Sequence, residues 1–267
     1  MHNIQRTKNS EPFIIHNSLA LSSPFFRFKQ FTVRHDCCAM KVGTDGVLLG
    51  AWAMLDEPGA VHTGKTTGAV LDIGTGSGLV ALMLAQRFPQ AEIDAIDIEP
   101  AAVEQARYNV LQSPWKERVR SFLSPLQEWQ TEKRYDLIVS NPPYFQNSLK
   151  NPDKGRELAR HTDSLTYAEL LHYSAQLLAH EGVIAFILPA ESEDDIIRLG
   201  ISEHLSCTRL TRVYSKAGKP AKRILIEFSA AKPATSSSPV IPSDFYIESL
   251  TSPRSPEYTA LTSAFYL

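Results

Sequence analysis

From residue 69 onward, short apolar runs alternate with longer segments of helical pattern, and this alternation limits the possible folds more than any other feature. The short apolar runs stand at 69–74, 91–98, 118–123, 135–140 and 182–189. The helical patterns between them cover 78–88, 100–112, 165–182 and 194–205. Short, continuously apolar runs are typical of strands that are buried on both faces. Strands that alternate with helices predict an α/β fold with a parallel sheet and helices on both faces.

The end of the chain modifies this pattern. Two further strands, at 208–215 and 222–229, are separated by a short loop and no helix, which predicts an antiparallel pair at the edge of the sheet. The expected total is seven strands, in a Rossmann-like arrangement. We expect residues 1–24 to form a flexible, loosely ordered tail and residues 25–267 to form a single domain that ends in a short helix.

Composition excludes several classes of protein. The hydrophobic and charged fractions, 43% and 21%, are those of an ordinary globular protein, and the net charge of −2 argues against binding nucleic acid or membranes by overall charge. No apolar run approaches the roughly 18 residues of a membrane span. We read the three cysteines, two of them adjacent (Cys37 and Cys38), as reduced thiols, so we expect a cytoplasmic protein. The absence of CxxC and HExxH patterns predicts no metal site.

The segment LDIGTGSG, residues 71–78, follows a strand and opens a helix. Its glycines allow a ligand to approach the backbone closely, because no Cβ intervenes. Position 79 is Leu, so the dinucleotide pattern GxGxxG is not met, and Asp72 suits a cationic ammonium better than a pyrophosphate. Asp97 ends the next strand about 20 residues later, where a carboxylate accepts hydrogen bonds from ribose hydroxyls.

These residues resemble the motifs of the class I S-adenosylmethionine-dependent methyltransferases. The resemblance implies S-adenosylmethionine as the cofactor, and it implies contacts to it from the loop and from the end of the following strand: Asp72, Gly74, Thr75, Gly76, Gly78, Asp97 and Ile98. Many relatives place an acid near the adenine ring, where this chain has Pro125. We therefore expect backbone groups around Leu126, with apolar contacts, to hold the adenine.

The fourth strand ends in Asn141-Pro142-Pro143-Tyr144, at the edge of the sheet where ligands bind in open α/β folds. The prolines stiffen the turn and leave carbonyl acceptors. The Asn141 oxygen and the Pro142 carbonyl can each accept an N–H from a planar amine, while Tyr144 can stack on a flat substrate. NPPY resembles the motif of amino-methyltransferases, which implies catalytic roles for these four residues and a further cofactor contact for Asn141.

The segment KVGTDGVLLGAW, residues 41–52, together with LDIGTGSGL, SPWKERV, NPPYF and the terminal YTALTSAFYL, closely resembles the bacterial tRNA(Val) adenine-N6 methyltransferase family. The resemblance covers roughly residues 25–267. It implies that the substrate is the adenine directly 3′ of the anticodon, that the partner is a tRNA anticodon stem-loop, and that Lys41, Thr44 and Asp45 contact the cofactor.

A basic segment supports a nucleic-acid partner. Residues 209–223 carry six basic side chains and no acid, whereas about 1.5 basic residues are expected from the ratio 27/267 over 15 positions. We predict an RNA-binding surface made of Arg160, Arg209, Arg212, Lys216, Lys219 and Lys222. We expect the protein to act as a monomer.

Two alternatives remain open. The same NPPY turn serves N-methylation of other planar amines, in an rRNA base, a DNA adenine or a protein glutamine amide. The last is disfavoured because no separate N-terminal helical domain is evident. A non-catalytic RNA-binding module is the other alternative, and the intact Asp72, glycines, Asp97 and NPPY argue against it.

Overall fold

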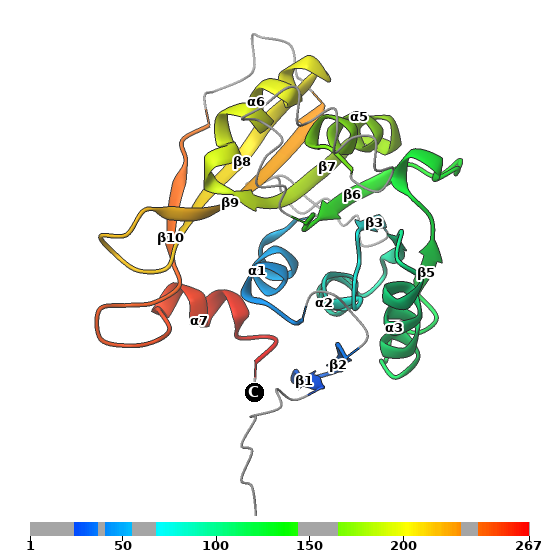
Figure 1. Ribbon diagram of the computed structural model, residues 1–267, viewed down its shortest axis with the longest axis horizontal. Coiled ribbons are helices and arrows are strands. Elements are labelled where there is room, and N and C mark those ends of the chain that lie inside the picture. The colour runs from blue at the N-terminus through cyan, green and yellow to red at the C-terminus, as the bar shows by residue number, and fades with distance from the viewer. Residues whose placement is uncertain (1–23, 37–40, 55–67, 144–164, 231–239, 267) are drawn as a thin grey trace, which may run out of the picture.

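The computed structural model describes residues 24–36, 41–54, 68–143, 165–230 and 240–266. Its centre is an eight-stranded sheet with the order β10-β8-β9-β7-β6-β3-β4-β5 (Figure 1). The strands are β3 (Ala69–Ile73), β4 (Glu92–Asp97), β5 (Val119–Leu123), β6 (Tyr135–Ser140), β7 (Leu178–Pro189), β8 (Leu205–Tyr214), β9 (Ala221–Ala230) and β10 (Ser243–Tyr246). A separate two-stranded hairpin is formed by β1 (Phe25–Arg27) and β2 (Thr32–Arg34). The α/β architecture predicted from the alternation is confirmed.

Helices cover both faces of the sheet. The helices are α1 (Thr44–Trp52), α2 (Leu79–Arg87), α3 (Pro100–Leu111), α5 (Tyr167–Leu177), α6 (Glu193–Ser202) and α7 (Pro256–Thr262), with short 3-10 turns η1 (Leu126–Glu128) and η2 (Ala190–Ser192). Successive residues of a strand point to opposite faces, so the sheet contributes side chains to two hydrophobic cores. One core contains residues of α1, α2, α3 and α7 with the β1–β2 hairpin, and the other contains residues of α5 and α6.

The sheet differs from the expected one at its far edge. There are eight strands rather than seven, because the short strand β10 pairs in parallel with β8. The antiparallel strand β9 lies inside the sheet, between β7 and β8, and pairs with both. The predicted antiparallel pairing of β8 and β9 is confirmed, and the difference is that the described strand β10, outside β8, forms the edge of the sheet.

The helix expected over 165–182 is also shorter in the structure. Helix α5 ends at Leu177, and β7 begins at Leu178, which pairs with Tyr135 of β6. Gly182 lies inside this strand, where a Cβ would meet the Tyr135 carbonyl oxygen at 2.7 Å. The glycine is thus required by close backbone approach between the strands.

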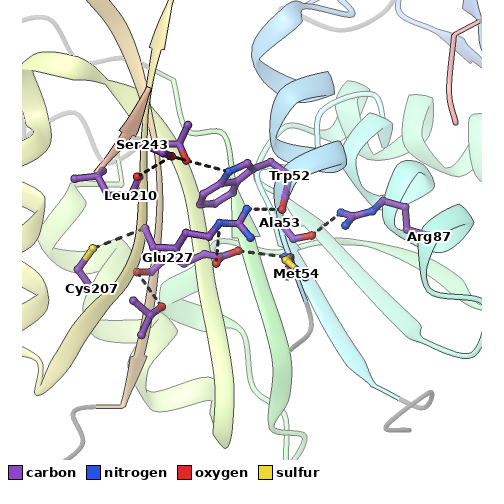
Figure 2. A network of polar contacts seen from close by, with 11 residues as sticks. Trp52, Ala53, Met54, Arg87, Cys207, Leu210, Glu227 and Ser243 are labelled. Atoms are coloured by element: carbon purple, nitrogen blue, oxygen red, sulfur yellow. Dashed lines mark hydrogen bonds and ion pairs between the residues drawn. The ribbon is translucent and has the colours of Figure 1, made fainter. Parts of the chain in front are cut away.

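A buried polar network fixes the C-terminal end of α1 (Figure 2). The Arg87 guanidinium of α2 donates to the carbonyls of Gly50 (3.0 Å) and Ala53. From the sheet, the Glu227 carboxylate accepts from the Met54 amide at 3.2 Å, and its other oxygen lies 3.5 Å from Arg209 Nε. These groups satisfy backbone atoms that a helix end leaves without intrahelical partners.

Four further observations bear on the sequence predictions. Cys207 is a free thiol, whereas Cys37 and Cys38 lie outside the described residues. No described helix combines the length and the apolar character needed to cross a membrane. The described His, Cys, Asp and Glu side chains form no group of three that could hold a metal ion. The tail predicted for residues 1–24 lies outside the described residues except for Pro24.

Candidate active site

The glycine loop between β3 and α2 is shaped by left-handed backbone. Gly74, Gly76 and Gly78 have φ values of +69°, +56° and +80°, a region that glycine enters without the Cβ penalty. The amides of Gly74 and Thr75 both donate to the Ile96 carbonyl of β4, at 2.9 and 3.0 Å. A Cβ built at Gly74 or Gly76 would meet no atom within 4 Å. The loop therefore presents bare backbone to open space at the carboxyl end of the sheet.

Asp72 holds this loop from inside. Its side chain is 1% exposed, and its Oδ2 accepts hydrogen bonds from Thr75 Oγ1 (2.6 Å) and from the Ala81 amide of α2 (3.1 Å). Burial raises the pKa of the carboxyl to about 6, although both hydrogen bonds act in the opposite direction. Asp72 thereby fixes the turn from β3 into α2.

Asp97 joins the loop to the end of β4. One carboxylate oxygen accepts from the Gly76 amide at 2.8 Å, and the other accepts from the Glu99 amide at 3.0 Å. The neighbouring Ile98 side chain is 45% exposed and supplies an apolar surface beside the carboxylate. The acid expected to meet a ribose is thus in direct contact with the glycine loop.

The region expected at the adenine follows β5. The Ser124 amide donates to the Asp97 carbonyl at 3.0 Å, which places the start of this segment against the end of β4. The Leu126 side chain is buried in the core, 4% exposed. The Leu126 carbonyl accepts from the Trp129 amide at 3.2 Å, and the expectation that backbone groups around Leu126 hold the adenine stays a prediction.

The NPPY turn begins beside the glycine loop, because β6 and β3 are parallel neighbours. Ile73 pairs with Ser140 at the ends of the two strands, and Ser140 Oγ donates to the Ile73 carbonyl at 2.9 Å. Asn141 is half-buried, Pro142 buried and Pro143 exposed. Gly74 and Asn141 are thus the next residues along adjacent strands. Tyr144 lies outside the described residues.

Helix α1 carries Thr44 and Asp45, which are predicted to contact the cofactor, to the edge of the sheet where the glycine loop lies. A Cβ at Gly46 would lie 3.0 Å from the Leu79 side chain, so the first turns of α1 and α2 are in contact. Thr44 and Asp45 begin α1, and Asp45 Oδ2 is paired with Arg223 Nε of β9 at 2.9 Å. Lys41 precedes the helix and is exposed. Thr44 and Asp45 therefore lie beside the helix that begins directly after the glycine loop.

The predicted RNA-binding residues separate into two groups. Lys216, Lys219 and Lys222 are exposed in or beside the β8–β9 turn. Since Arg223 of β9 pairs with Pro189 at the end of β7, this turn lies at the carboxyl edge of the parallel strands, on the same edge as Gly74 and Asn141.

The two arginines of β8 are engaged elsewhere. Arg212 donates to both Glu193 oxygens, at 2.8 and 2.6 Å. Arg209 is an interior residue: its side chain is 19% exposed, its guanidinium carbon lies 3.4 Å from the centre of the Trp52 ring, and Nη2 donates to the Trp52 carbonyl at 2.6 Å. The expectation that Arg209 belongs to an RNA-binding surface is wrong, because the alternation of β8 turns it into the core. Arg160 lies outside the described residues.

Sequence reasoning missed Asn109, a buried polar residue on α3 that is 1% exposed. Its Nδ2 donates to the carbonyls of Ser77 and Arg34, both at 2.8 Å, and its Oδ1 accepts from the Arg34 amide at 2.9 Å. Asn109 therefore ties the β1–β2 hairpin to the glycine loop. The signal was an asparagine within an otherwise helical pattern, where it requires buried partners.

Comparison with known proteins bears on the family. Residues 59–193 match the model of the methyltransferase small domain. A Bacteroides thetaiotaomicron protein named tRNA1(Val) (adenine(37)-N6)-methyltransferase is 46% identical over 92% of this chain and 99% of its own length. The Aeromonas hydrophila protein of the same name is 43% identical over 91% of this chain and 97% of its own.

Two solved structures share the fold. A predicted O-methyltransferase from Agrobacterium tumefaciens superposes with a TM-score of 0.58 at 16% identity, over 83% of this chain and 96% of its own. A putative class I S-adenosylmethionine-dependent methyltransferase from Listeria monocytogenes gives a TM-score of 0.53 at 14% identity, over 76% of this chain and 65% of its own.

At these identities the two solved structures show the fold alone. The two named tRNA methyltransferases match almost the whole chain. The chain belongs to the tRNA1(Val) (adenine(37)-N6)-methyltransferase family, within the class I methyltransferase fold.

Proposed function

We propose that the protein transfers the methyl group of S-adenosylmethionine to N6 of the adenine directly 3′ of the anticodon in tRNA1(Val). The observation that carries the proposal is the placement of the glycine loop, Asp97 and Asn141 at neighbouring strand ends. The name shared by relatives that match almost the whole chain supports the choice of substrate.

The residues present fit the cofactor. S-adenosylmethionine supplies a methyl group on a positively charged sulfur. The bare backbone at Gly74 and Gly76 leaves room for a ligand, and Asp97 offers a carboxylate for ribose hydroxyls beside the exposed Ile98 side chain. Asp72 contributes by holding the loop, since its Oδ2 is engaged by Thr75 and Ala81.

Asn141 and Pro142 are proposed to position the target amine. The Asn141 side-chain oxygen and the Pro142 carbonyl would each accept an N–H of the adenine amino group, which would fix the orientation of its nitrogen for methylation. No strong base is needed, because methylation acidifies the nitrogen and its proton leaves afterwards. The contribution of these residues is orientation and electrostatic stabilisation. We assign the proposed stacking contact to Tyr144.

The exposed lysines of the β8–β9 turn, Lys216, Lys219 and Lys222, are proposed to contact tRNA phosphates. They lie at the same edge of the sheet as the proposed chemistry, whereas the overall charge of −2 provides no general attraction for RNA. We also propose that the enzyme acts as a monomer in the cytoplasm. Light scattering with and without tRNA tests the oligomeric state.

Methyl transfer from labelled S-adenosylmethionine to bulk tRNA that lacks the modification tests the function. Label recovered as N6-methyladenosine, at the position 3′ of the anticodon in tRNA1(Val), is the expected result. Label in another nucleoside, in DNA or only in protein would instead assign one of the other planar amines. No transfer, combined with tight tRNA binding, would indicate a non-catalytic RNA-binding protein.

A further inference from the structure

A groove runs between the β1–β2 hairpin and the C-terminal half of α3, and its described lining contains none of the residues assigned to chemistry. Its volume is about 540 Å³, and its described lining comes from the hairpin, from α3 and from Gln112 directly after α3. Buried Phe28 and Phe31 anchor the hairpin to the core beneath it, at 2% and 5% exposure. The proposed function assigns nothing to this groove.

The lining is cationic. Arg27, Lys29 and Arg34 line the groove, and no Asp or Glu is among the described lining residues. Lys29 Nζ donates to the Ser263 carbonyl at 2.7 Å, which fixes the ammonium at the rim without neutralising it. Arg34 pairs with Asp36 at 2.8 Å, and its side chain remains 44% exposed. A groove with several cations and no lining carboxylate is complementary to a polyanion.

Aromatic rings lie among these cations. Phe25 and Tyr108 both line the groove, with exposed fractions of 45% and 44%. The guanidinium carbon of Arg34 lies 5.3 Å from the centre of the Tyr108 ring, which holds the ring in place from one side. Exposed aromatic faces beside arginines are the combination that stacks unpaired bases while the cations bind the backbone.

The groove is joined to the proposed active site through Asn109. Its amide nitrogen donates both to the Arg34 carbonyl in the groove and to the Ser77 carbonyl in the glycine loop, each at 2.8 Å. The hairpin and the loop are therefore held by one side chain. A ligand that binds the hairpin is positioned relative to the cofactor loop by this link.

We propose that this groove is a second RNA-binding site, which holds a strand of the substrate tRNA outside the target nucleotide. Arg27, Lys29 and Arg34 bind backbone phosphates, and the exposed Tyr108 ring receives an unpaired base. The proposal rests on the proposed function for the identity of the RNA. An RNA strand is favoured over an acidic protein because planar stacking faces accompany the charges.

Charge reversal at Arg27 tests the site. Arg27→Glu is compared with Arg134→Glu, a matched reversal of an exposed arginine just before β6, at the opposite end of that strand from Asn141. We expect Arg27→Glu to raise the KM for tRNA about tenfold, to lower the slope of log Kd against log salt by about 1, and to leave kcat and the Kd for S-adenosylmethionine unchanged. Arg134→Glu and Arg27→Lys should stay within twofold of the wild type.

A second variant, Tyr108→Leu, removes the stacking face and retains an apolar side chain. It should raise the KM for tRNA several-fold with no change in the salt slope, because no phosphate contact is lost. Circular dichroism melting of each variant establishes that the fold is intact. A wild-type KM and salt slope in folded Arg27→Glu would overturn the proposal. Tighter binding of an acidic protein than of tRNA would also overturn it, and would assign the groove to a protein partner. If the wild type itself fails to methylate tRNA, the proposed function is wrong. The tRNA affinity of Arg27→Glu, compared with that of the wild type, then still tests whether the groove binds RNA.

Discussion

Gly76 is the residue at which backbone conformation and space for a ligand coincide. Its φ is +56°, a Cβ there would meet nothing within 4 Å, and its amide donates to Asp97. Gly218, in the β8–β9 turn, has φ +77° and equally open surroundings. The two glycines therefore share the backbone strain that alanine would introduce and differ in their relation to the proposed cofactor site.

We expect Gly76→Ala and Gly218→Ala each to lower the free energy of unfolding by about 1 kcal/mol, because both force alanine into the left-handed region. Only Gly76→Ala should weaken S-adenosylmethionine binding, since its new methyl group occupies the space left for the ligand. Denaturant titration and calorimetric binding measure the two effects. Equal cofactor affinity in the two variants would show that the open space at Gly76 is not the cofactor site.

The proposed role of Asn141 depends on its side-chain oxygen as an acceptor. We expect Asn141→Ala to lower kcat about 10²-fold or more, by analogy with the loss of one preorganised polar contact, with little change in cofactor affinity. Asn141→Asp keeps an acceptor oxygen in the same place and should retain more activity than the alanine variant. Single-turnover methyl transfer to tRNA measures both. An aspartate variant no better than the alanine variant would mean that the amide N–H, rather than the oxygen, matters.

At the scale of elements, helices α1 and α2 pack so closely that one position between them has no room for a side chain. A Cβ at Gly50 would lie 2.8 Å from Met83 Sδ and 2.9 Å from Met83 Cβ. We expect Gly50→Ala to lower the free energy of unfolding by about 1–3 kcal/mol through overpacking. Gly43→Ala is the control: its Cβ would meet only the Lys41 carbonyl at 3.7 Å, so it should lose only the preference for glycine at the N-cap of α1, about 0.5–1 kcal/mol. Urea unfolding compares the two, and equal losses would argue against tight packing at Gly50.

The elements that the sequence predicted correctly are those whose pattern is local. The strand at 69–73 and the helix that begins at Leu79 are bounded by glycines, and Pro100 marks the start of α3. The strand at 178–181 could not be predicted in this way, because leucine, alanine, histidine and glutamate continue a helical pattern and only pairing with Tyr135 makes them a strand. Strand β10 was missed for a related reason: four residues carry too little periodicity, and their pairing partner, β8, is about 30 residues away.

The residues of the candidate site likewise differ in whether a local sequence pattern predicts them. The glycine loop, Asp97 and Asn141 form contiguous motifs, and the parallel order of β4, β3 and β6 explains why they meet. The inward orientation of Arg209 and the bridging role of Asn109 depend on contacts with distant residues, Glu227 and Arg34, that no local pattern contains.

At the scale of the whole molecule, Glu227 couples the stability of the fold to pH. Its side chain is 1% exposed, and burial raises the pKa of the carboxyl to about 7, although Arg209 acts against this shift. The folded protein therefore keeps a proton on Glu227 in a range where the unfolded chain, with a pKa near 4.5, has released it. Between about pH 4.5 and 7 the folded state binds more protons, so the free energy of unfolding falls as pH rises through this window.

Glu227→Gln removes this titration. We expect the decrease in the free energy of unfolding between pH 5 and pH 7.5, measured by urea denaturation, to be smaller in Glu227→Gln than in the wild type. Asp72, with a pKa raised to about 6, contributes a slope of the same sign that the variant retains. Parallel pH dependences in the two proteins would show that Glu227 is not the titrating group.

The hairpin beside the proposed RNA groove is held by residues from the other end of the chain. The Lys29 amide donates to the Phe265 carbonyl at 2.8 Å, and Lys29 Nζ donates to the Ser263 carbonyl, 234 positions later. On the ribosome, residues 25–34 are synthesised well before these partners, because Ser263 follows Lys29 by 234 positions. The groove therefore takes its final shape only after residues 263–265 have left the exit tunnel, so this surface matures late relative to the synthesis of its own hairpin.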